Sequence, residues 1–337
     1  MSDNHEEKTV NGKISIRLLT ALWLTLPALA HAQQPAKIAK VGWLESGNTD
    51  RSSRVGEMFM RRLSELGLVE SKNIAFEIRS ADNQLDRLPS LAEELVRLHV
   101  DVLFTTATPA LIAARNATKT IPIIFIQLAV DPVAAGFVES LARPGGNITG
   151  LTNFAAELTG KRLEILKEAV PKLSRVAILW EPKNAGSAQT WKESQAPAKE
   201  LGLQLHSMEV SAGDQFEGAF ANAVKARSAA VAVTPMVLAA THRQKLVDLT
   251  VRHRLPAMYY RDSFVESGGL MSYGADLTDH FKRAAEYIDK ILKGTKPADL
   301  PVEQPKKFEF IVNLIAAKQI GLTIPPQVLA RANRVIR

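Results

Sequence analysis

The chain has 337 residues, of which 46% are hydrophobic and 23% are charged, and it contains no cysteine. This composition excludes a disulfide-rich scaffold and a disordered protein, and the length allows two domains of ordinary size. The net charge is +7, but the basic residues are scattered among acidic ones, so we expect no binding to nucleic acid.

The first element in chain order is a short apolar run behind two basic residues. Lys13 and Arg17 precede the run 18–30, which leads into an A-x-A sequence ending at Ala32. This arrangement is typical of a secretory signal peptide. A membrane anchor or a buried helix is the alternative, but a bilayer span takes about 20 apolar residues. We therefore expect residues 1–32 to be a leader and signal peptide, cleaved after Ala32, and the mature protein to be periplasmic.

After the signal peptide, short apolar runs alternate with longer amphipathic runs, a pattern that predicts parallel α/β units. The apolar runs are continuous rather than alternating, as in strands that are buried on both faces of a sheet. We expect strands at 38–44, 73–80, 100–106 and 121–127, and helices at 51–66, 85–100, 109–119 and 131–142.

A similar series begins after residue 152. It predicts helices at 160–171, 188–202, 214–228 and 237–254, and strands at 175–180, 204–210, 229–235 and 256–260. The tail differs, with a strand-like run at 268–275, a helix at 278–294, a Pro-rich connector at 296–305, a strand at 308–313 and a helix at 313–321. If that first tail helix returns to the first half and the last strand joins the second, the chain crosses between the halves three times.

These patterns predict an α/β protein with two similar lobes built on mainly parallel sheets. We expect an N-terminal lobe of residues 36–148 plus 275–303, and a C-terminal lobe of residues 152–272 plus 306–337. The stretch 140-SLARPGGNITGLTNF-154 runs from a predicted helix into a strand, whereas a phosphate-binding glycine loop runs from a strand into a helix. We interpret it as the first crossing between the lobes.

Several long segments resemble one protein family. They are 65-ELGLVESKNIAFEIRSADNQLDRLPSLAEELVRLHVDVLFT-105, 131-DPVAAGFVESLARPGGNITGLT-152, 160-GKRLEILKEAVPKLSRVAILWEP-182 and 268-GGLMSYGADLTDHFKRAAEYIDKILKG-294. They resemble the ABC-transporter substrate-binding family that includes tryptophan- and tyrosine-binding proteins, over about residues 36–337. The resemblance implies a type I periplasmic-binding-protein fold with three inter-lobe crossings and a ligand in the cleft. It also implies an ABC permease and its ATPase as partners, and we expect a monomer.

No pattern in the sequence predicts catalysis. The histidines lack the HExxH spacing, there is no cysteine nucleophile, and the glycines form neither a G-x-S-x-G elbow nor a Walker loop. We therefore expect a binding protein without a metal or cofactor. A ligand-sensing module of the same fold and an exported α/β enzyme remain alternatives, because a fold does not fix a function.

Candidate ligand contacts lie where the predicted strands end, since ligands of open α/β sheets bind at the carboxyl ends of the strands. The candidates are Ser46, Thr106, Thr108, Asp131, Asn153, Trp180, Thr234, Tyr259, Asp262 and Tyr273. They suggest an amino acid or a small carboxylate or aromatic compound as the solute.

Each type of candidate has a structural alternative. Thr108 either helps a helix N-terminus to hold a carboxylate or merely caps that helix. Asp131 either receives a ligand ammonium group or caps a helix, and Arg261 and Asp262 either pair with each other or meet a charged ligand. The aromatic candidates either sandwich a flat group or lie in the core.

Overall fold

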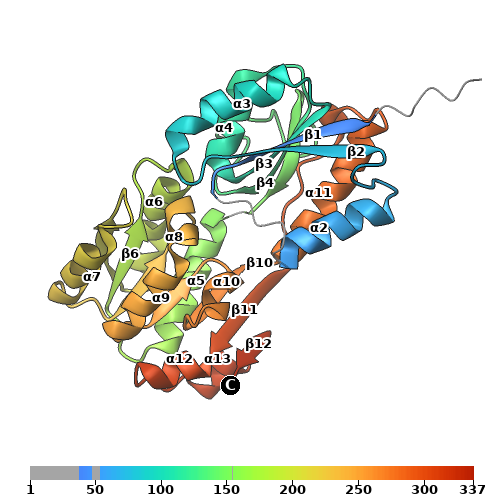
Figure 1. Ribbon diagram of the computed structural model, residues 1–337. Helices are drawn as coiled ribbons and strands as arrows, with labels where there is room; N and C mark the ends of the chain where they lie inside the picture. Colours follow the sequence, from blue (N-terminus) through green and yellow to red (C-terminus); the bar gives the residue numbers. More distant parts are fainter. Residues whose placement is uncertain (1–37, 48–53, 154) are drawn as a thin grey trace, which may run out of the picture. The chain divides into compact units, whose positions relative to one another are not determined.

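The computed structural model describes residues 38–47, 54–153 and 155–337. The predicted signal peptide therefore lies outside the described residues. Residues Ala39–Arg337 form one compact unit, which contains two separate sheets of mostly parallel strands covered by helices (Figure 1). This confirms the predicted α/β class.

The first sheet has five strands in the order β2-β1-β3-β4-β5, and every neighbouring pair is parallel. Its strands are β1 (Ala39–Glu45), β2 (Ile74–Ser80), β3 (Val102–Thr106), β4 (Ile123–Leu128) and β5 (Ile148–Thr152). Its helices are α2 (Arg54–Glu65), η1 (Leu85–Arg87), α3 (Leu88–Arg97), α4 (Ala107–Ala117), α11 (Leu277–Leu292) and η2 (Pro297–Asp299). Figure 1 shows α3 and α4 on one face and α2 and α11 on the other.

Two hydrophobic clusters explain why this sheet is covered on both faces. One joins leucines of α3 and α4 to residues such as Leu103 and Phe125. The other joins Trp43, Phe104 and residues of α11, with the Trp43 and Phe104 ring centroids 5.1 Å apart. The strands carry apolar side chains on both sides because both faces are buried.

The second sheet has seven strands in the order β12-β11-β10-β9-β8-β6-β7, with an antiparallel pairing of β10 and β11. Its strands are β6 (Arg175–Trp180), β7 (Gln204–Glu209), β8 (Ala230–Val233), β9 (Ala257–Tyr259), β10 (Met271–Ala275), β11 (Phe308–Asn313) and β12 (Arg334–Ile336). Its helices are α5 (Ala155–Ala169), α6 (Ala185–Glu200), α7 (Phe216–Lys225), α8 (Val237–Thr241), α9 (Arg243–Arg252), α10 (Asp262–Glu266), α12 (Leu314–Gln319) and α13 (Pro326–Leu329).

The chain passes between the two sheets three times, as predicted. It does so after β5, between β10 and α11, and between Glu303 and β11. Backbone hydrogen bonds join these passages: the Thr152 amide donates to the Glu303 carbonyl at 3.0 Å, and the Asp276 amide donates to the Lys307 carbonyl at 3.1 Å. The first passage is thus tied to the third, and the third to the second.

Two predicted helices are wrong in detail. Residues 131–142 form turns rather than a helix, and Gly136 in this segment has a left-handed φ of +66°, which ends the helical hydrogen bonding after one turn. The predicted helix 237–254 is divided at His242 into α8 and α9. Gly145, in the segment 140–154 that we interpret as the first crossing, has a φ of +83°.

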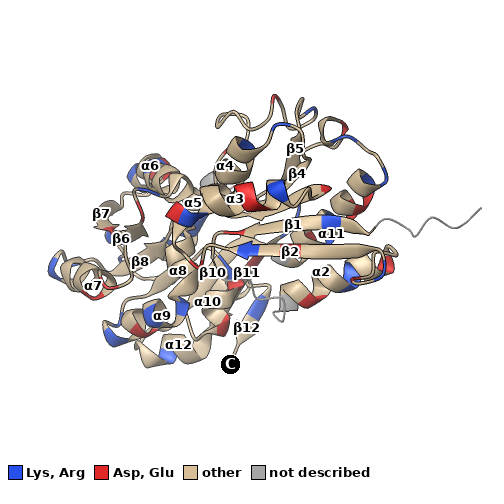
Figure 2. Cartoon of the chain, turned by 45° about the horizontal axis from the view of Figure 1, so that its top comes forward, with Lys and Arg blue, Asp and Glu red and all other residues tan. Residues whose placement is uncertain are grey.

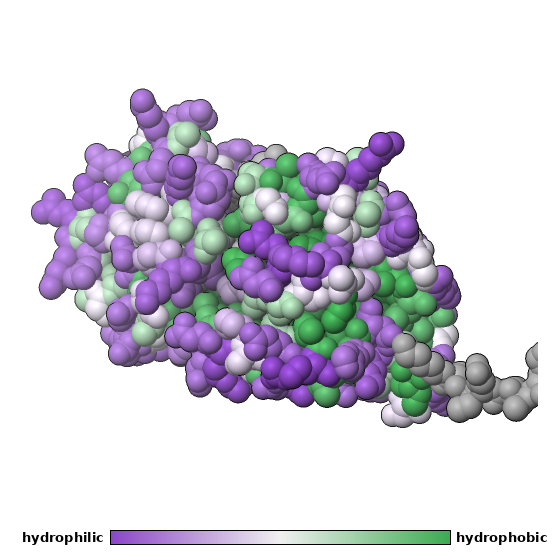
Figure 3. Space-filling model, turned by 90° about the horizontal axis from the view of Figure 1, so that it is seen from above, coloured by the Kyte–Doolittle hydropathy of each residue, from purple (hydrophilic) through white to green (hydrophobic). Residues whose placement is uncertain are grey.

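The surface carries both signs of charge, with Lys and Arg interspersed among Asp and Glu over the helices (Figure 2). On the face seen from above, most of the surface is hydrophilic, and smaller groups of hydrophobic residues lie between the hydrophilic ones (Figure 3). Within the described part of the chain, no helix has both the length and the apolar character needed to cross a membrane.

Candidate binding site

A cavity of about 410 Å³ lies where the carboxyl ends of strands from both sheets meet. From the first sheet it receives residues at or next to the carboxyl ends of β1, β3, β4 and β5: Glu45, Thr106, Gln127 and Asn153. From the second it receives those that follow β6, β8 and β9: Asn184, Pro235, Met236, Tyr260 and Arg261. This main cavity has the position and the size expected of a site for a small solute.

Glu45, the last residue of β1, is the acidic group among the described residues that line the main cavity. Its carboxylate accepts hydrogen bonds from the Trp43 Nε1 and the Gly47 amide, each at 3.4 Å. Burial raises the pKa of the Glu45 carboxyl, while hydrogen bonds from Thr106, Gly47 and Trp43 and the charge of Arg261 act in the opposite direction. These neighbours favour the charged form of a carboxylate that burial disfavours.

The N-terminus of α4 forms another wall. Thr106, Ala107, Thr108 and Pro109 all line the cavity, and the side chain of the N-cap residue Thr106 makes no capping hydrogen bond to the helix. The first amides of a helix lack intrahelical partners and carry a partial positive charge, so this turn favours an anionic group. Ala107 holds this turn in a left-handed conformation with a φ of +66°. A non-glycine residue in that region stores strain, which is typical of ligand sites.

The second sheet contributes positive charge. Arg261 lies with its guanidinium carbon 5.8 Å from the centroid of the Tyr260 ring, and the Arg243 Nε donates to the Ser267 hydroxyl at 2.7 Å. The Tyr260 hydroxyl donates to the Met236 carbonyl at 3.3 Å, and burial raises the pKa of this phenol, which keeps it neutral. Arg243, Tyr260 and Arg261 all line the main cavity.

A small chamber of about 30 Å³ adjoins the main cavity and shares Gln127, Asn153 and Arg261 with it. Arg162 of α5 also lines this chamber; it is 5% exposed, and its Nε donates to the Tyr273 carbonyl at 2.7 Å. Burial lowers the pKa of Arg162 to about 10, so its guanidinium stays charged at neutral pH. The Asn153 Oδ1 is buried without a hydrogen-bond partner among the described residues, which leaves an acceptor beside the cavity.

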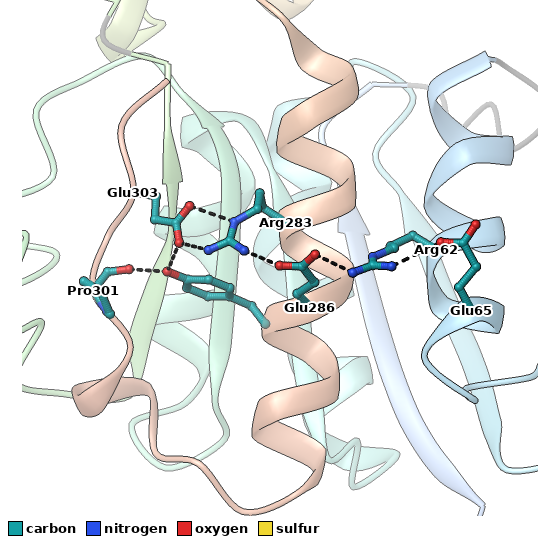
Figure 4. A network of polar contacts seen from close by, with 7 residues as sticks. Arg62, Glu65, Arg283, Glu286, Pro301 and Glu303 are labelled. Carbon is teal, nitrogen blue, oxygen red and sulfur yellow. Dashed lines mark hydrogen bonds and ion pairs between the residues drawn. The ribbon is translucent and has the colours of Figure 1, made fainter. Parts of the chain in front are cut away.

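The third passage between the sheets is fixed by a charged network at its start (Figure 4). Glu303 pairs with Arg283 of α11, Arg283 also pairs with Glu286, and Glu286 accepts a hydrogen bond from Arg62 of α2 at 2.7 Å. The Tyr287 hydroxyl donates to Glu303 at 3.1 Å. The segment that ends at Glu303 is therefore held on the first sheet and its helices.

Comparison with known proteins assigns the family. The model of the family described as ABC transporter substrate binding protein matches residues 51–336. The chain belongs to this family. Its fold is that of the type I periplasmic binding proteins.

Three relatives show the extent of the similarity. The chain is 26% identical to the tyrosine-binding protein of Clostridioides difficile over 264 residues, which are 78% of this chain and 75% of that protein. It is 27% identical to a conserved domain protein from Vibrio cholerae, over 89% of this chain and 100% of that one, with a TM-score of 0.83. It is 26% identical to an ABC domain from Streptococcus pneumonia in complex with L-Trp, over 88% and 99% of the chains, with a TM-score of 0.80.

Of the residues predicted to contact a ligand, three line the main cavity: Thr106, Thr108 and Asn153. Two others support residues that line it. Ser46 is fully buried beside Glu45, and its hydroxyl donates to the Thr106 carbonyl at 3.4 Å. Thr234 precedes Pro235, and its hydroxyl donates to the Leu179 carbonyl at 2.9 Å. Ser46 and Thr234 thus hold the backbone next to the cavity in place.

The aromatic candidates lie elsewhere, in packed surroundings. Trp180 stacks on Trp191 with ring centroids 5.5 Å apart, and Tyr273 stacks on Phe308 at 6.1 Å. Tyr259 has no exposed surface and stacks on Phe264 at 4.7 Å. The structure does not bring these three rings to the cavity, because each packs on a neighbouring helix or strand of its own sheet.

The acidic candidates accept hydrogen bonds from backbone amides close to them in the sequence. Asp131 is exposed, and its carboxylate accepts from the amides of Val133 at 2.8 Å and Ala134 at 3.2 Å. Asp262 begins α10 and accepts from the Ser263 amide at 2.8 Å. Neither lines the main cavity. Asp131 thus caps a turn, because residues 131–142 do not form the helix that it was predicted to cap.

The remaining polar and aromatic lining residues were not among the ten candidates: Trp43, Glu45, Gln127, Asn184, Thr241, Arg243, Tyr260, Arg261 and Phe281. Two carried a signal in the sequence. Glu45 stands at the end of the first predicted strand, and Arg261 stands beside Asp262 after a later one. Arg243 carried none, because the sequence predicted one unbroken helix across its position.

Proposed function

We propose that the protein is the extracytoplasmic receptor of an ABC importer, which closes its two lobes on a small solute and delivers it to a membrane permease. The solute is an amino acid or a small carboxylate or aromatic compound. The proposal includes the signal peptide at 1–32, a periplasmic location, the lobe boundaries given above and a monomeric state without catalytic activity. The importer's ATPase is the partner on the other side of the membrane.

One observation carries this proposal: charged groups of opposite sign line a single solute-sized cavity where the two sheets meet. Glu45 comes from the first sheet and Arg261 from the second. A ligand that contacts both sheets links them, and three hydrogen-bonded passages provide the axis about which such lobes close.

The relatives support the kind of solute. One is named a tyrosine-binding protein, and the structure of another contains L-Trp. Aromatic side chains that line the main cavity here, Trp43, Tyr260 and Phe281, suit a flat apolar group.

Intrinsic fluorescence tests the proposal at the cavity itself. The chain beginning at Gln33 contains Trp43, Trp180 and Trp191, and of these only Trp43 lines the cavity. We expect a saturable fluorescence change on titration with a phenyl-bearing carboxylate, retained in Trp180→Phe and lost in Trp43→Phe. A change that persists in Trp43→Phe and disappears in Trp180→Phe would place binding elsewhere.

A thermal-shift screen of amino acids and carboxylates tests the solute class. A ligand of the native state raises the apparent stability, by about 2.7 kcal/mol at a hundred times its Kd. Binding without turnover is the expected result. No stabilisation by any member of the screen, or conversion of a solute into product, contradicts the proposed receptor.

A further inference from the structure

The charges that line the main cavity are unequal. Of its described lining residues, Glu45 is the single acidic one, Arg243 and Arg261 are basic, and none is a lysine, histidine or aspartate. Two positive charges against one negative charge leave an excess of +1. The N-terminus of α4 adds a further partial positive charge on the first-sheet side.

The one carboxylate is already engaged. Glu45 accepts hydrogen bonds from Trp43 and Gly47 and is attracted by Arg261 across the cavity. An ammonium group placed on Glu45 would compete with these donors, and it would also lie near a guanidinium of the same sign. The site therefore provides no free carboxylate, among its described lining residues, to bind an ammonium group.

The two arginines, in contrast, lack a carboxylate of their own. No ion pair joins Arg243 or Arg261 to an acidic side chain of the described residues, and the hydrogen bond of Arg243 goes to the neutral hydroxyl of Ser267. Closure over a solute removes water from these charges, and a desolvated charge is costly unless it is paired. A solute carboxylate provides that partner.

We infer, on the basis of the proposed function, that the solute is an aromatic carboxylate without a balancing ammonium group. The anionic end meets the arginines and the first turn of α4. The apolar end meets rings and aliphatic side chains of the same cavity, among them Trp43, Phe281 and Val237. A zwitterion would leave the excess positive charge in place. This solute class differs from the amino acids named for the two relatives above.

Three matched probes test the inference: 3-phenylpropionate is an anion, L-phenylalanine is a zwitterion and 2-phenylethylamine is a cation. All three share a phenyl ring on a two-carbon chain. By calorimetric titration of the chain beginning at Gln33, we expect 3-phenylpropionate to bind at least about tenfold more tightly than L-phenylalanine, and the amine not to bind, since each tenfold step corresponds to about 1.4 kcal/mol. Tighter binding of L-phenylalanine or of the amine overturns the inference and leaves the proposed receptor intact.

Two variants sharpen the test. Glu45→Gln removes the one negative charge and should tighten 3-phenylpropionate binding by about threefold or more, since charges in a water-poor site interact strongly. Arg243→Gln should weaken it by about tenfold, whereas the exposed Arg252→Gln should not change it. Weakening by Glu45→Gln contradicts the inference. Absence of binding by all three probes and by the whole solute screen contradicts both the inference and the proposed receptor.

Discussion

Arg283 and Glu303 form a two-point ion pair in which the Arg283 Nε donates to Glu303 Oε2 at 2.9 Å and the Nη2 donates to Oε1. Both side chains are partly buried, at 33% and 22% exposure. Because Glu303 ends the segment that runs along β5, this pair ties the beginning of the third passage to α11. Paired hydrogen bonds of this kind fix geometry as well as charge.

Breaking this pair should destabilise the protein. We expect Arg283→Gln to lower the free energy of unfolding by about 1–3 kcal/mol, which is less than for a fully buried pair because solvent screens part of the interaction. Urea unfolding at pH 7 measures it. The matched control is Arg252→Gln, whose partner Glu217 is 51% exposed and whose effect should stay within about 0.5 kcal/mol. Equal effects of the two variants would contradict the structural role of Arg283.

The same pair predicts a stability loss in acid. Burial would raise the pKa of the Glu303 carboxyl, but hydrogen bonds and charge from Arg283 lower it below its usual value. When the pKa of a carboxyl is lower in the folded state than in the unfolded chain, where it is near 4.3, ionisation of that carboxyl stabilises the folded protein. This stabilisation is fully present above the unfolded-state pKa and is lost as the pH falls through the folded-state pKa. Below pH 5, the free energy of unfolding should fall less steeply with decreasing pH in Glu303→Gln than in the natural protein. An unchanged slope would argue against this linkage.

His280 predicts a second acid effect at higher pH. Its ring is 2% exposed, both ring nitrogens lack hydrogen-bond partners among the described residues, and burial lowers its pKa despite the charges of Asp279, Asp276 and Glu303. The unfolded chain then binds the proton more readily, so stability falls as pH drops below about 6.5. His280→Phe should flatten the pH dependence of unfolding between about pH 6.5 and 5. A profile identical to that of the natural protein would refute this assignment.

Gly150 should not tolerate a side chain. A Cβ there would lie 2.0 Å from the Phe125 carbonyl oxygen, where β4 and β5 change register. We expect Gly150→Ala to cost more than about 3 kcal/mol or to prevent folding, because the contact is with backbone that has little room to move. Gly146→Ala is the control, since a Cβ at that position meets nothing within 4 Å. Thermal unfolding that is the same for both variants would contradict the prediction.

Ala107 should link backbone strain to binding. A left-handed φ costs an alanine about 1–2 kcal/mol and a β-branched residue more. Ala107→Val should therefore lower stability by a further 1 kcal/mol or so and weaken solute binding by about tenfold, because the first turn of α4 moves. Ala107→Gly should leave the solute affinity within about threefold and should not lower stability as Ala107→Val does, since glycine adopts this conformation freely. Calorimetric titration of the two variants distinguishes them, and equal affinities would show that this turn does not contact the solute.

The sequence predicted the α/β class and most elements because their signals are local. Continuous apolar runs marked β3 and β4, and the polar residues at the end of β3 with Pro109 behind them marked Thr106 and Thr108 as cavity residues. These predictions needed only the rule that the carboxyl ends of parallel strands meet at one edge.

Some residues that were predicted to contact the ligand do not line the cavity, because the tertiary packing around them differs from what the sequence pattern indicates. At the end of β9, Tyr259 packs on Phe264 while the next residue, Tyr260, lines the cavity. Neighbouring side chains of a strand point to opposite sides, so an error of one residue moves a contact from site to core. Asp131 misses the cavity because its segment forms turns rather than the predicted helix, and its exposed carboxylate accepts from the amides of Val133 and Ala134.

The most direct test of the central claim is a calorimetric titration of the chain beginning at Gln33 with 3-phenylpropionate, repeated on Arg261→Gln. A carboxylate that is paired in a closed cavity should bind with a 1:1 stoichiometry and a Kd of about 10 μM or tighter, and loss of the arginine should cost at least about tenfold. Saturable binding that weakens in Arg261→Gln is the predicted result. Binding that is unaffected by Arg261→Gln would contradict the claim that the cavity between the two sheets holds the solute.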